Sequence, residues 1–259
     1  MSGTTIRLTM AQALAKFLTR QKTIIDGKTV PLFGGVFAIF GHGNVAGFGE
    51  ALYQVRDELP TYRAHNEQSM AHAAIAFAKA SFRRRMMAVT SSIGPGATNM
   101  VTAAALAHVN RLPLLLLPGD IFANRAPDPV LQQVENFSDG TVSANDVFRP
   151  VSRYFDRITR PEQIISALNR AMQVLTDPAE CGPVTLALCQ DVQAEAFDYP
   201  EAMFEDRIWL PRRPAPDAHQ FRVAVEALRV AQKPVIIAGG GVLFSEAAAA
   251  LRAFAEKHG

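Results

Sequence analysis

Short apolar runs alternate with stretches of helical periodicity through the first 190 residues. The runs are too short for helices and predict buried strands at residues 36–40, 62–64, 87–90, 114–117 and 183–188. Between them, apolar positions at helical spacing predict helices at residues 10–18, 49–58, 67–80, 96–108 and 161–175. Strands that alternate with helices indicate an α/β fold in which a parallel sheet is covered on both faces.

The pattern changes after residue 190. Residues 191–217 contain four prolines and the only tryptophan, and they show no clean period, so we expect an interdomain linker there. A helix at 219–230, a strand at 234–238 and a helix at 245–257 are then predicted, with three glycines after the strand. One such unit cannot bury a sheet of its own, so residues 218–259 are expected to begin a second domain that continues beyond this chain.

Composition narrows the class of protein. Hydrophobic residues make up 49% and charged residues 19%, and the net charge is +2, which argues against disorder and against a nucleic-acid or membrane partner. Cys181 and Cys189 fit neither a disulfide framework nor a metal pair, and no metal site is expected here. There is no signal-peptide core, and the apolar stretch at 112–118 is too short to span a bilayer. A cytoplasmic protein is expected.

The first polar segment, Gly41-His42-Gly43-Asn44, lies between a predicted strand and a predicted helix. Its glycines permit tight backbone turns or the close approach of a ligand. The dinucleotide fingerprint is incomplete because residue 46 is alanine. Local evidence therefore leaves a simple turn and a binding loop equally open.

The second polar segment, residues 65–68, places Glu67 at the start of an apolar helix. A carboxylate at this position often does no more than interact with the helix dipole, and local evidence favours that reading. His65 and Glu67 also have the spacing of a zinc deaminase signature, but the downstream PCxxC is absent.

The third polar segment, residues 91–99, has the sequence SSIGPGATN and again joins a strand to a helix. Two glycines around a proline predict a fixed, compact turn. Its hydroxyls and amides could also bind a polar ligand, because open α/β sheets place ligands at the carboxyl ends of their strands. It is neither a nucleophile elbow nor a Walker loop.

Taken in order and spacing, the three segments resemble the pyrimidine-binding domain of thiamine diphosphate enzymes, in particular the acetohydroxyacid synthase group. The strings that carry the resemblance are GVFAIFGHGN, NEQSMAHAAIAFAK and TSSIGPGATNMVTAA. GPVTLALCQDVQ is similar to the closing strand of that domain, and PVIIAGGGV to the start of the family's central Rossmann-like domain. The resemblance covers essentially the whole chain and implies a pyrimidine-binding domain at residues 1–190.

Three further strings are similar to a branch of the family that hydrolyses a ring carbon–carbon bond of a cyclic 1,2-diketone in myo-inositol degradation. They are IRLTMAQAL, FGHGNVAGFGEAL and LLLPGDIFANRAPDPVLQQVE. Residues 129–133 also lack the segment typical of acetohydroxyacid synthases. Two alternatives stay open: a carboligase or decarboxylase of the same superfamily, and a non-catalytic module that binds a nucleotide or cofactor.

The resemblance also implies roles for individual residues. Glu67 would activate the cofactor by hydrogen-bonding the aminopyrimidine ring, which requires a carboxyl group that holds or shares a proton. The pyrimidine would be flanked by Ser92, Pro95 and Asn99. The substrate side would be lined by His42, Gly43, Asn44 and Gln132, with His42 a proton donor to the diketone oxygen.

In the family, Mg²⁺ and the cofactor's diphosphate are held by a later domain with a GDG…N motif, which does not occur in this chain. The family's active site forms between two subunits, so a homodimer or homotetramer is expected. The resemblance therefore implies that this chain holds half of a site, binds thiamine diphosphate weakly and is inactive alone.

Overall fold

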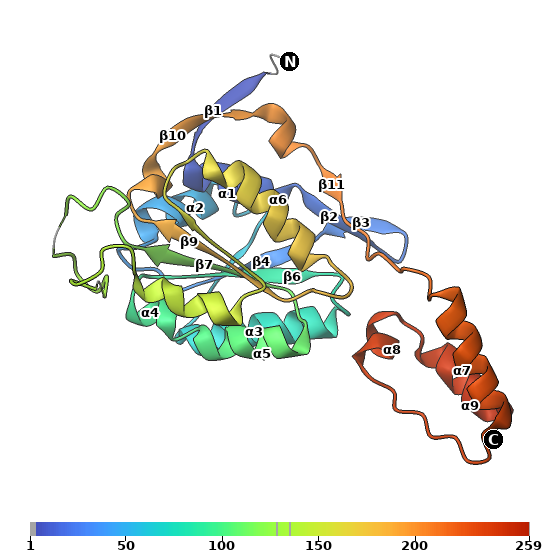
Figure 1. The fold of residues 1–259 in the computed structure, drawn as a ribbon. Coiled ribbons are helices and arrows are strands. Elements are labelled where there is room, and N and C mark those ends of the chain that lie inside the picture. The colour runs from blue at the N-terminus through green and yellow to red at the C-terminus, as the bar shows by residue number, and fades with distance from the viewer. Residues whose placement is uncertain (1–3, 128, 135, 259) are drawn as a thin grey trace. The chain divides into compact units, whose positions relative to one another are not determined.

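The computed structural model describes residues 4–127, 129–134 and 136–258, and it divides into two compact units, Met1–Pro211 and Arg212–Gly259 (Figure 1). The first unit is built on a six-stranded sheet in which all neighbouring strands are parallel. In spatial order its strands are β5 (Thr61–Arg63), β4 (Phe33–Ala38), β6 (Met86–Ser91), β7 (Leu114–Asp120), β9 (Pro183–Cys189) and β8 (Tyr154–Ile158). This sheet confirms the predicted α/β fold.

Helices cover both faces of the sheet (Figure 1). On one face lie α1 (Met10–Thr19), α2 (Glu50–Gln54) and α6 (Gln163–Leu175), and on the other α3 (Glu67–Ala80), α4 (Pro95–Thr98) and α5 (Val101–Asn110). Every residue of β6, β7 and β9 is buried, as expected for central strands between two helical layers. Helix α1 begins with a capping box between Thr9 and Gln12, which satisfies two amides at its start.

Two predicted helices of the first unit are shorter or interrupted. The helix expected at 49–58 is a π-helical turn, η1 (Val45–Gly49), followed by α2, which ends at Gln54. The helix expected at 96–108 is split into α4 and α5. The edge strand β8 and the 3₁₀ segment η2 (Ala144–Val151) were not predicted, because their polar residues hide the apolar pattern.

The expected linker at 191–217 differs from the structure, since most of it packs on the first unit. After η3 (Val192–Ala194), β10 (Ala196–Pro200) pairs antiparallel with β1 (Thr5–Thr9). After η4 (Glu201–Phe204), β11 (Arg207–Ile208) pairs with β2 (Gln21–Ile25), which in turn pairs with β3 (Lys28–Pro31).

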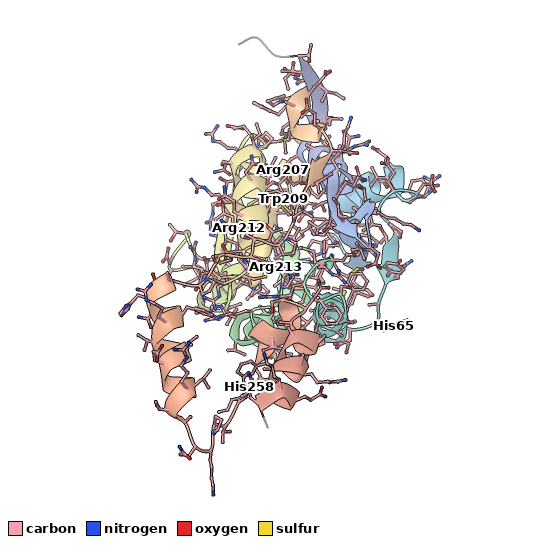
Figure 2. All side chains as sticks on the ribbon, turned by 90° about the vertical axis from the view of Figure 1, so that its right-hand side faces the viewer. His65, Arg207, Trp209, Arg212, Arg213 and His258 are labelled. Carbon is pink, nitrogen blue, oxygen red and sulfur yellow. The ribbon has the colours of Figure 1, made fainter. Side chains whose placement is uncertain are left out.

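The sole tryptophan closes this segment. The indole nitrogen of Trp209 donates to Gln21 Oε1 at 2.9 Å, and the guanidinium of Arg207 lies 4.1 Å from the indole ring centre (Figure 2). Local sequence does not reveal these pairings, which join the two ends of the unit.

The second unit contains α7 (Ala218–Val230), α8 (Gly240–Phe244) and α9 (Ala248–His258). The strand predicted at 234–238 is not formed, so that prediction is wrong for this structure. A strand needs a neighbour for its backbone hydrogen bonds, and the described residues of this unit include no other strand. Val235 and Ile237 are 87% and 93% exposed, which shows that this apolar run has no layer to pack against.

Candidate functional site

Three connections meet at the carboxyl edge of the six-stranded sheet. Residues 41–49 follow β4, residues 92–99 follow β6, and residues 121–127, 129–134 and 136–143 follow β7. Because β4, β6 and β7 are parallel neighbours, the side chains that follow them gather at one edge, where open α/β sheets bind their ligands.

A pocket of about 500 Å³ opens at this edge. It is lined by Glu67, Ser92, Ile93, Pro95, Gly96, Thr98, Asn99 and Gln132. The structure thus brings together five residues that the sequence analysis singled out, which are Glu67, Ser92, Pro95, Asn99 and Gln132. Ile93, Gly96 and Thr98 were not singled out, although they belong to the same turn.

Glu67 is the first residue of α3, and the local sequence fixes its position. The side chain of Asn66 caps the helix by accepting a hydrogen bond from the Ser69 amide at 2.9 Å. Glu67 Oε2 accepts a hydrogen bond from Asn99 Nδ2 at 2.8 Å. No described residue hydrogen-bonds Oε1, which lies beside Gly96, where a Cβ would stand 3.2 Å away. One carboxylate oxygen is therefore held, and the other is available to a ligand.

The turn at 92–99 is shaped by Gly94 and Pro95. Gly94 has a φ of +65°, which favours glycine, and a Cβ there would collide with the carbonyl oxygen of Gln132. Pro95 starts α4 at a helical position that tolerates proline. Ser92 Oγ is buried and has no hydrogen-bond partner among the described residues. Ser92 lines the pocket, but its hydroxyl oxygen lies on the side of Gly41, where an added Cβ would collide with it.

The loop that carries Gln132 is anchored near both of its ends. Near its start, Asp191 accepts hydrogen bonds from the amides of Ala123 at 2.8 Å and Asn124 at 3.1 Å. At its far end, Arg157 donates to Asp120 and to Ser143 Oγ, each at 2.7 Å. Gln132 itself is exposed and has a φ of +61°.

His42, Gly43 and Asn44 are not among the residues that line the pocket. Asn44 is 1% exposed, and its side chain closes its own turn: Oδ1 accepts from the Gly41 amide at 2.9 Å, and Nδ2 donates to Ile39 O at 3.2 Å and to Thr90 Oγ1 at 3.1 Å. Gly43 is buried. His42 is half-buried, and its Nε2 has no hydrogen-bond partner in the described part of the chain.

Sequence reasoning missed Gln193, which follows β9 and also contacts this turn. Its Nε2 donates to Gly43 O at 2.7 Å, and its Oε1 accepts from the Phe48 amide at 3.1 Å. The only local signal is a polar residue just after a buried strand, and this signal does not distinguish a buried glutamine from an exposed one.

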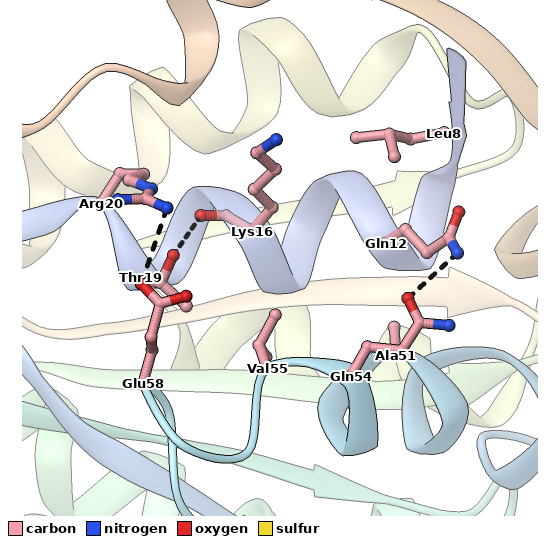
Figure 3. A pocket seen from close by; sticks show the side chains of 9 residues that line it. All are labelled: Leu8, Gln12, Lys16, Thr19, Arg20, Ala51, Gln54, Val55 and Glu58. Carbon is pink, nitrogen blue, oxygen red and sulfur yellow. Dashed lines mark hydrogen bonds and ion pairs between the residues drawn. The ribbon is translucent and has the colours of Figure 1, made fainter. Parts of the chain in front are cut away.

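A second pocket, of about 250 Å³, lies between α1 and α2 (Figure 3). Two pairs of its polar side chains contact each other: Gln12 donates to Gln54 Oε1 at 3.1 Å, and Arg20 lies 3.6 Å from Glu58. Lys16, which also lines the pocket, lies 5.2 Å from the centre of the Phe204 ring.

Three further features from the sequence analysis were His65, possible metal ligands and possible membrane-spanning helices. His65 lies exposed, just before α3 (Figure 2). Within residues 4–127, 129–134 and 136–258, no group of three or more His, Cys, Asp or Glu could hold a metal ion. Over the same residues, the helices are all too short or too polar to cross a membrane.

Comparison with known families defines the class of this fold and site. Residues 34–139 match the N-terminal thiamine pyrophosphate-binding domain of thiamine pyrophosphate enzymes, and residues 221–259 match the central domain of the same enzymes. The two matches together cover more than half of the chain. The chain therefore belongs to the thiamine pyrophosphate (thiamine diphosphate) enzyme family. The family resemblance inferred from the three polar segments is confirmed.

Among individual proteins, the chain is similar to enzymes named 3D-(3,5/4)-trihydroxycyclohexane-1,2-dione hydrolase. It is 56% identical over 253 residues to that of Geobacillus thermodenitrificans, covering 98% of this chain and 40% of the relative. It is 54% identical over 252 residues to that of Clostridium perfringens, covering 97% of this chain and 39% of the relative. The chain therefore spans about 40% of the length of the curated relatives that it matches.

Proposed function

We propose that the full-length protein hydrolyses a ring carbon–carbon bond of 3D-(3,5/4)-trihydroxycyclohexane-1,2-dione with thiamine diphosphate as cofactor. Full-length here means this chain together with any residues that its gene encodes after residue 259. The observation that carries the proposal is Glu67, which faces the pocket and is held by Asn99 at 2.8 Å. Identity of 53–56% to enzymes of that name, over nearly the whole chain, supports the choice of substrate.

The pocket suits the aminopyrimidine half of the cofactor. A flat, polar ring needs hydrogen-bonding groups at its edge, and Glu67 Oε1 is such a group without a described partner at the pocket. Pro95 also lines the pocket, is exposed, and offers an apolar surface to a ring face. We assign Glu67, Ser92, Pro95 and Asn99 to this half of the cofactor.

Carbon–carbon cleavage next to a carbonyl leaves an electron pair that no side chain accepts well, and bound thiamine diphosphate supplies that electron sink. In this proposal, the residues of this chain orient a proton donor toward the cofactor. Glu67 Oε1 would share a proton with the aminopyrimidine ring, while Asn99 fixes the orientation of the carboxyl group through Oε2. Because the amide of Asn99 is neutral, it orients the carboxyl group without adding charge beside it.

On the substrate side, we assign His42 and Gln132 to the diketone. His42 Nε2 is buried and without a described partner, so the ring can donate a proton to a substrate oxygen. Gln132 brings an amide to the pocket mouth. Gly43 and Asn44 support the turn that carries His42, and this assignment differs from the direct substrate contact suggested by the sequence.

The rest of the site belongs to the same proposal. We propose that Mg²⁺ and the diphosphate are held outside this chain's pocket, by a second subunit of a homo-oligomer. We also propose that the unit Met1–Pro211 acts as the pyrimidine-side domain and that residues 218–259 begin the central domain. The pyrimidine-side domain alone would then lack the part of the active site that the second subunit supplies.

The test is to incubate the full-length protein with the cyclic dione or with pyruvate, each with and without thiamine diphosphate and Mg²⁺. We expect the dione to be consumed with formation of an acyclic acid, only when the cofactor is present, and pyruvate to remain unchanged. Turnover of pyruvate instead of the dione would favour a carboligase or decarboxylase. Binding of the cofactor without turnover of either compound would favour a non-catalytic module.

A further inference from the structure

We propose that Gln193 is a positioning residue that sets the place of His42, and this inference rests on the proposed function. Gln193 follows β9, whereas His42 follows β4, two strands that are not neighbours in the sheet. The side chain of Gln193 reaches the 41–49 turn and fixes the backbone on the C-terminal side of His42.

The contacts of Gln193 use most of its hydrogen-bonding capacity. The residue is 1% exposed. Its Nε2 donates to Gly43 O at 2.7 Å and to Leu188 O at 3.1 Å, and its Oε1 accepts from the Phe48 amide at 3.1 Å. One side chain thus holds Gly43, which precedes η1, and Phe48, which lies within η1, and a buried amide held in this way has a single favoured orientation.

Glycines allow the 41–49 turn to approach Gln193 and the neighbouring backbone closely. A Cβ at Gly47 would lie 2.5 Å from the Cβ of Gln193, so only a residue without a side chain fits there. Gly43 is confined from two other directions: a Cβ on Gly43 would stand 2.9 Å from the Ile93 amide, and a Cβ on Gly119 would stand 2.6 Å from Gly43 O. The Gly43 backbone therefore packs closely between β7 and the 92–99 turn. The Gly43 carbonyl oxygen in this position accepts the hydrogen bond from Gln193.

This arrangement links His42 to the pocket. Ile93 lines the pocket and touches Gly43, so the distance between His42 and the pocket wall depends on where the Gly43 peptide lies. Loss of the amide would let this peptide relax, and a shift of about 1 Å in a reacting group can cost on the order of 100-fold in rate. The same strand end also anchors the Gln132 loop, because Asp191 accepts the amides of Ala123 and Asn124.

The experiment compares Gln193→Met with Gln21→Met in the full-length holoenzyme. Gln21 is a matched control: it is also a glutamine with 1% exposure, its Nε2 donates to Phe17 O at 2.8 Å and its Oε1 accepts from Trp209, and it lies in β2 of the three-stranded sheet. We expect Gln193→Met to lower kcat by about 10- to 100-fold with KM changed by less than about 3-fold. Gln21→Met should lower Tm to a similar extent and leave kcat within about 2-fold.

A double-mutant cycle with His42→Ala separates positioning from general loss of stability. If Gln193 acts through His42, Gln193→Met should change kcat by less than about 2-fold when His42 is already alanine. Should Gln193→Met not fold, Gln193→Ala takes its place, because it also removes the donor to Gly43 and adds no bulk.

Three results would overturn the inference while the dione is still turned over: full additivity in the cycle, an unchanged kcat in the folded Gln193 variant, or no effect of His42→Ala alone. Absence of cofactor-dependent turnover in the unsubstituted protein would be a different failure. It would overturn the proposed function and the inference with it.

Discussion

Two glycine-containing turns follow neighbouring strands of the same sheet, but only one of them lines the pocket. In the 41–49 turn, Asn44 and Gln193 hydrogen-bond the backbone of the turn itself, whereas His42 Nε2 has no partner among the described residues. In the 92–99 turn, Ser92 Oγ has no described partner and Asn99 leaves Glu67 Oε1 available. Both turns combine glycines with polar residues after a buried strand, so the turn that lines the pocket is distinguished from the other by its hydrogen-bond partners.

The largest effect on stability is expected for a substitution of Gly94, which shapes the 92–99 turn. Gly94→Ala combines a positive φ with a collision against Gln132 O, and should lower the free energy of unfolding by about 2–5 kcal/mol. Gly27→Ala is the control, because Gly27 has a φ of +75° but nothing within 4 Å of the added Cβ, so only about 1–2 kcal/mol of strain applies. Urea unfolding followed by Trp209 fluorescence measures both; equal losses would mean that the contact with Gln132 does not shape the turn.

Asn44→Ala should cost about 2–3 kcal/mol of unfolding free energy, because it removes the three hydrogen bonds of a buried side chain and leaves the Gly41 amide without its partner. The matched control is Asn110→Ala, an exposed asparagine with one hydrogen bond to Leu106 O, for which a change within about 0.5 kcal/mol is expected. The same urea titration applies. If the two variants behaved alike, the 41–49 turn would not depend on its internal amide.

In the pocket turn, Asn99→Ala should act on turnover more than on folding. Asn99 is half-buried and makes one hydrogen bond to Glu67, so we expect about 1 kcal/mol or less of lost stability. Turnover of the dione by the full-length protein should fall about 10-fold because the carboxyl group of Glu67 loses its orientation. Steady-state kinetics at saturating cofactor measures this, and unchanged turnover would contradict the positioning role of Asn99.

The smallest change in stability is expected for Ser92→Ala. Its hydroxyl has no described partner, so the free energy of unfolding should change by less than about 0.5 kcal/mol. Thr90→Val, in the adjoining strand, should cost about 1–3 kcal/mol because Thr90 Oγ1 donates to Leu117 O at 2.8 Å and accepts from Asn44. Reversal of this order would contradict the contrast between the two turns.

The parallel sheet could be predicted from the sequence because its central strands are uninterrupted apolar runs. The run at 114–117, for example, lies within the fully buried strand β7. The pairing of β1 with β10 could not be predicted, since it joins Thr5 to Pro200 and depends on contacts that a local window does not contain. The strand at 234–238 was predicted from a local apolar pattern, and such a pattern does not indicate whether a neighbouring strand is present for pairing.

At the site, residues within one turn were easier to predict than residues that reach it from elsewhere. Ser92, Pro95 and Asn99 lie in a compact motif, and the structure places all three in the pocket lining with Glu67. Asn44 was expected to face the substrate, but its type and position do not reveal that its amide is used by its own turn. Gln193 was missed because its contacts lie about 150 residues away in sequence.

The central claim is that Glu67 activates thiamine diphosphate, and its most direct test is the Glu67→Gln variant of the full-length protein. Glutamine keeps the shape of the side chain and its acceptor for Asn99, but it cannot hold the proton that is shared with the pyrimidine. Dione turnover at saturating thiamine diphosphate should fall by about 100- to 10,000-fold with Tm nearly unchanged. A folded Glu67→Gln variant with turnover within about 3-fold of the unsubstituted protein would contradict the account.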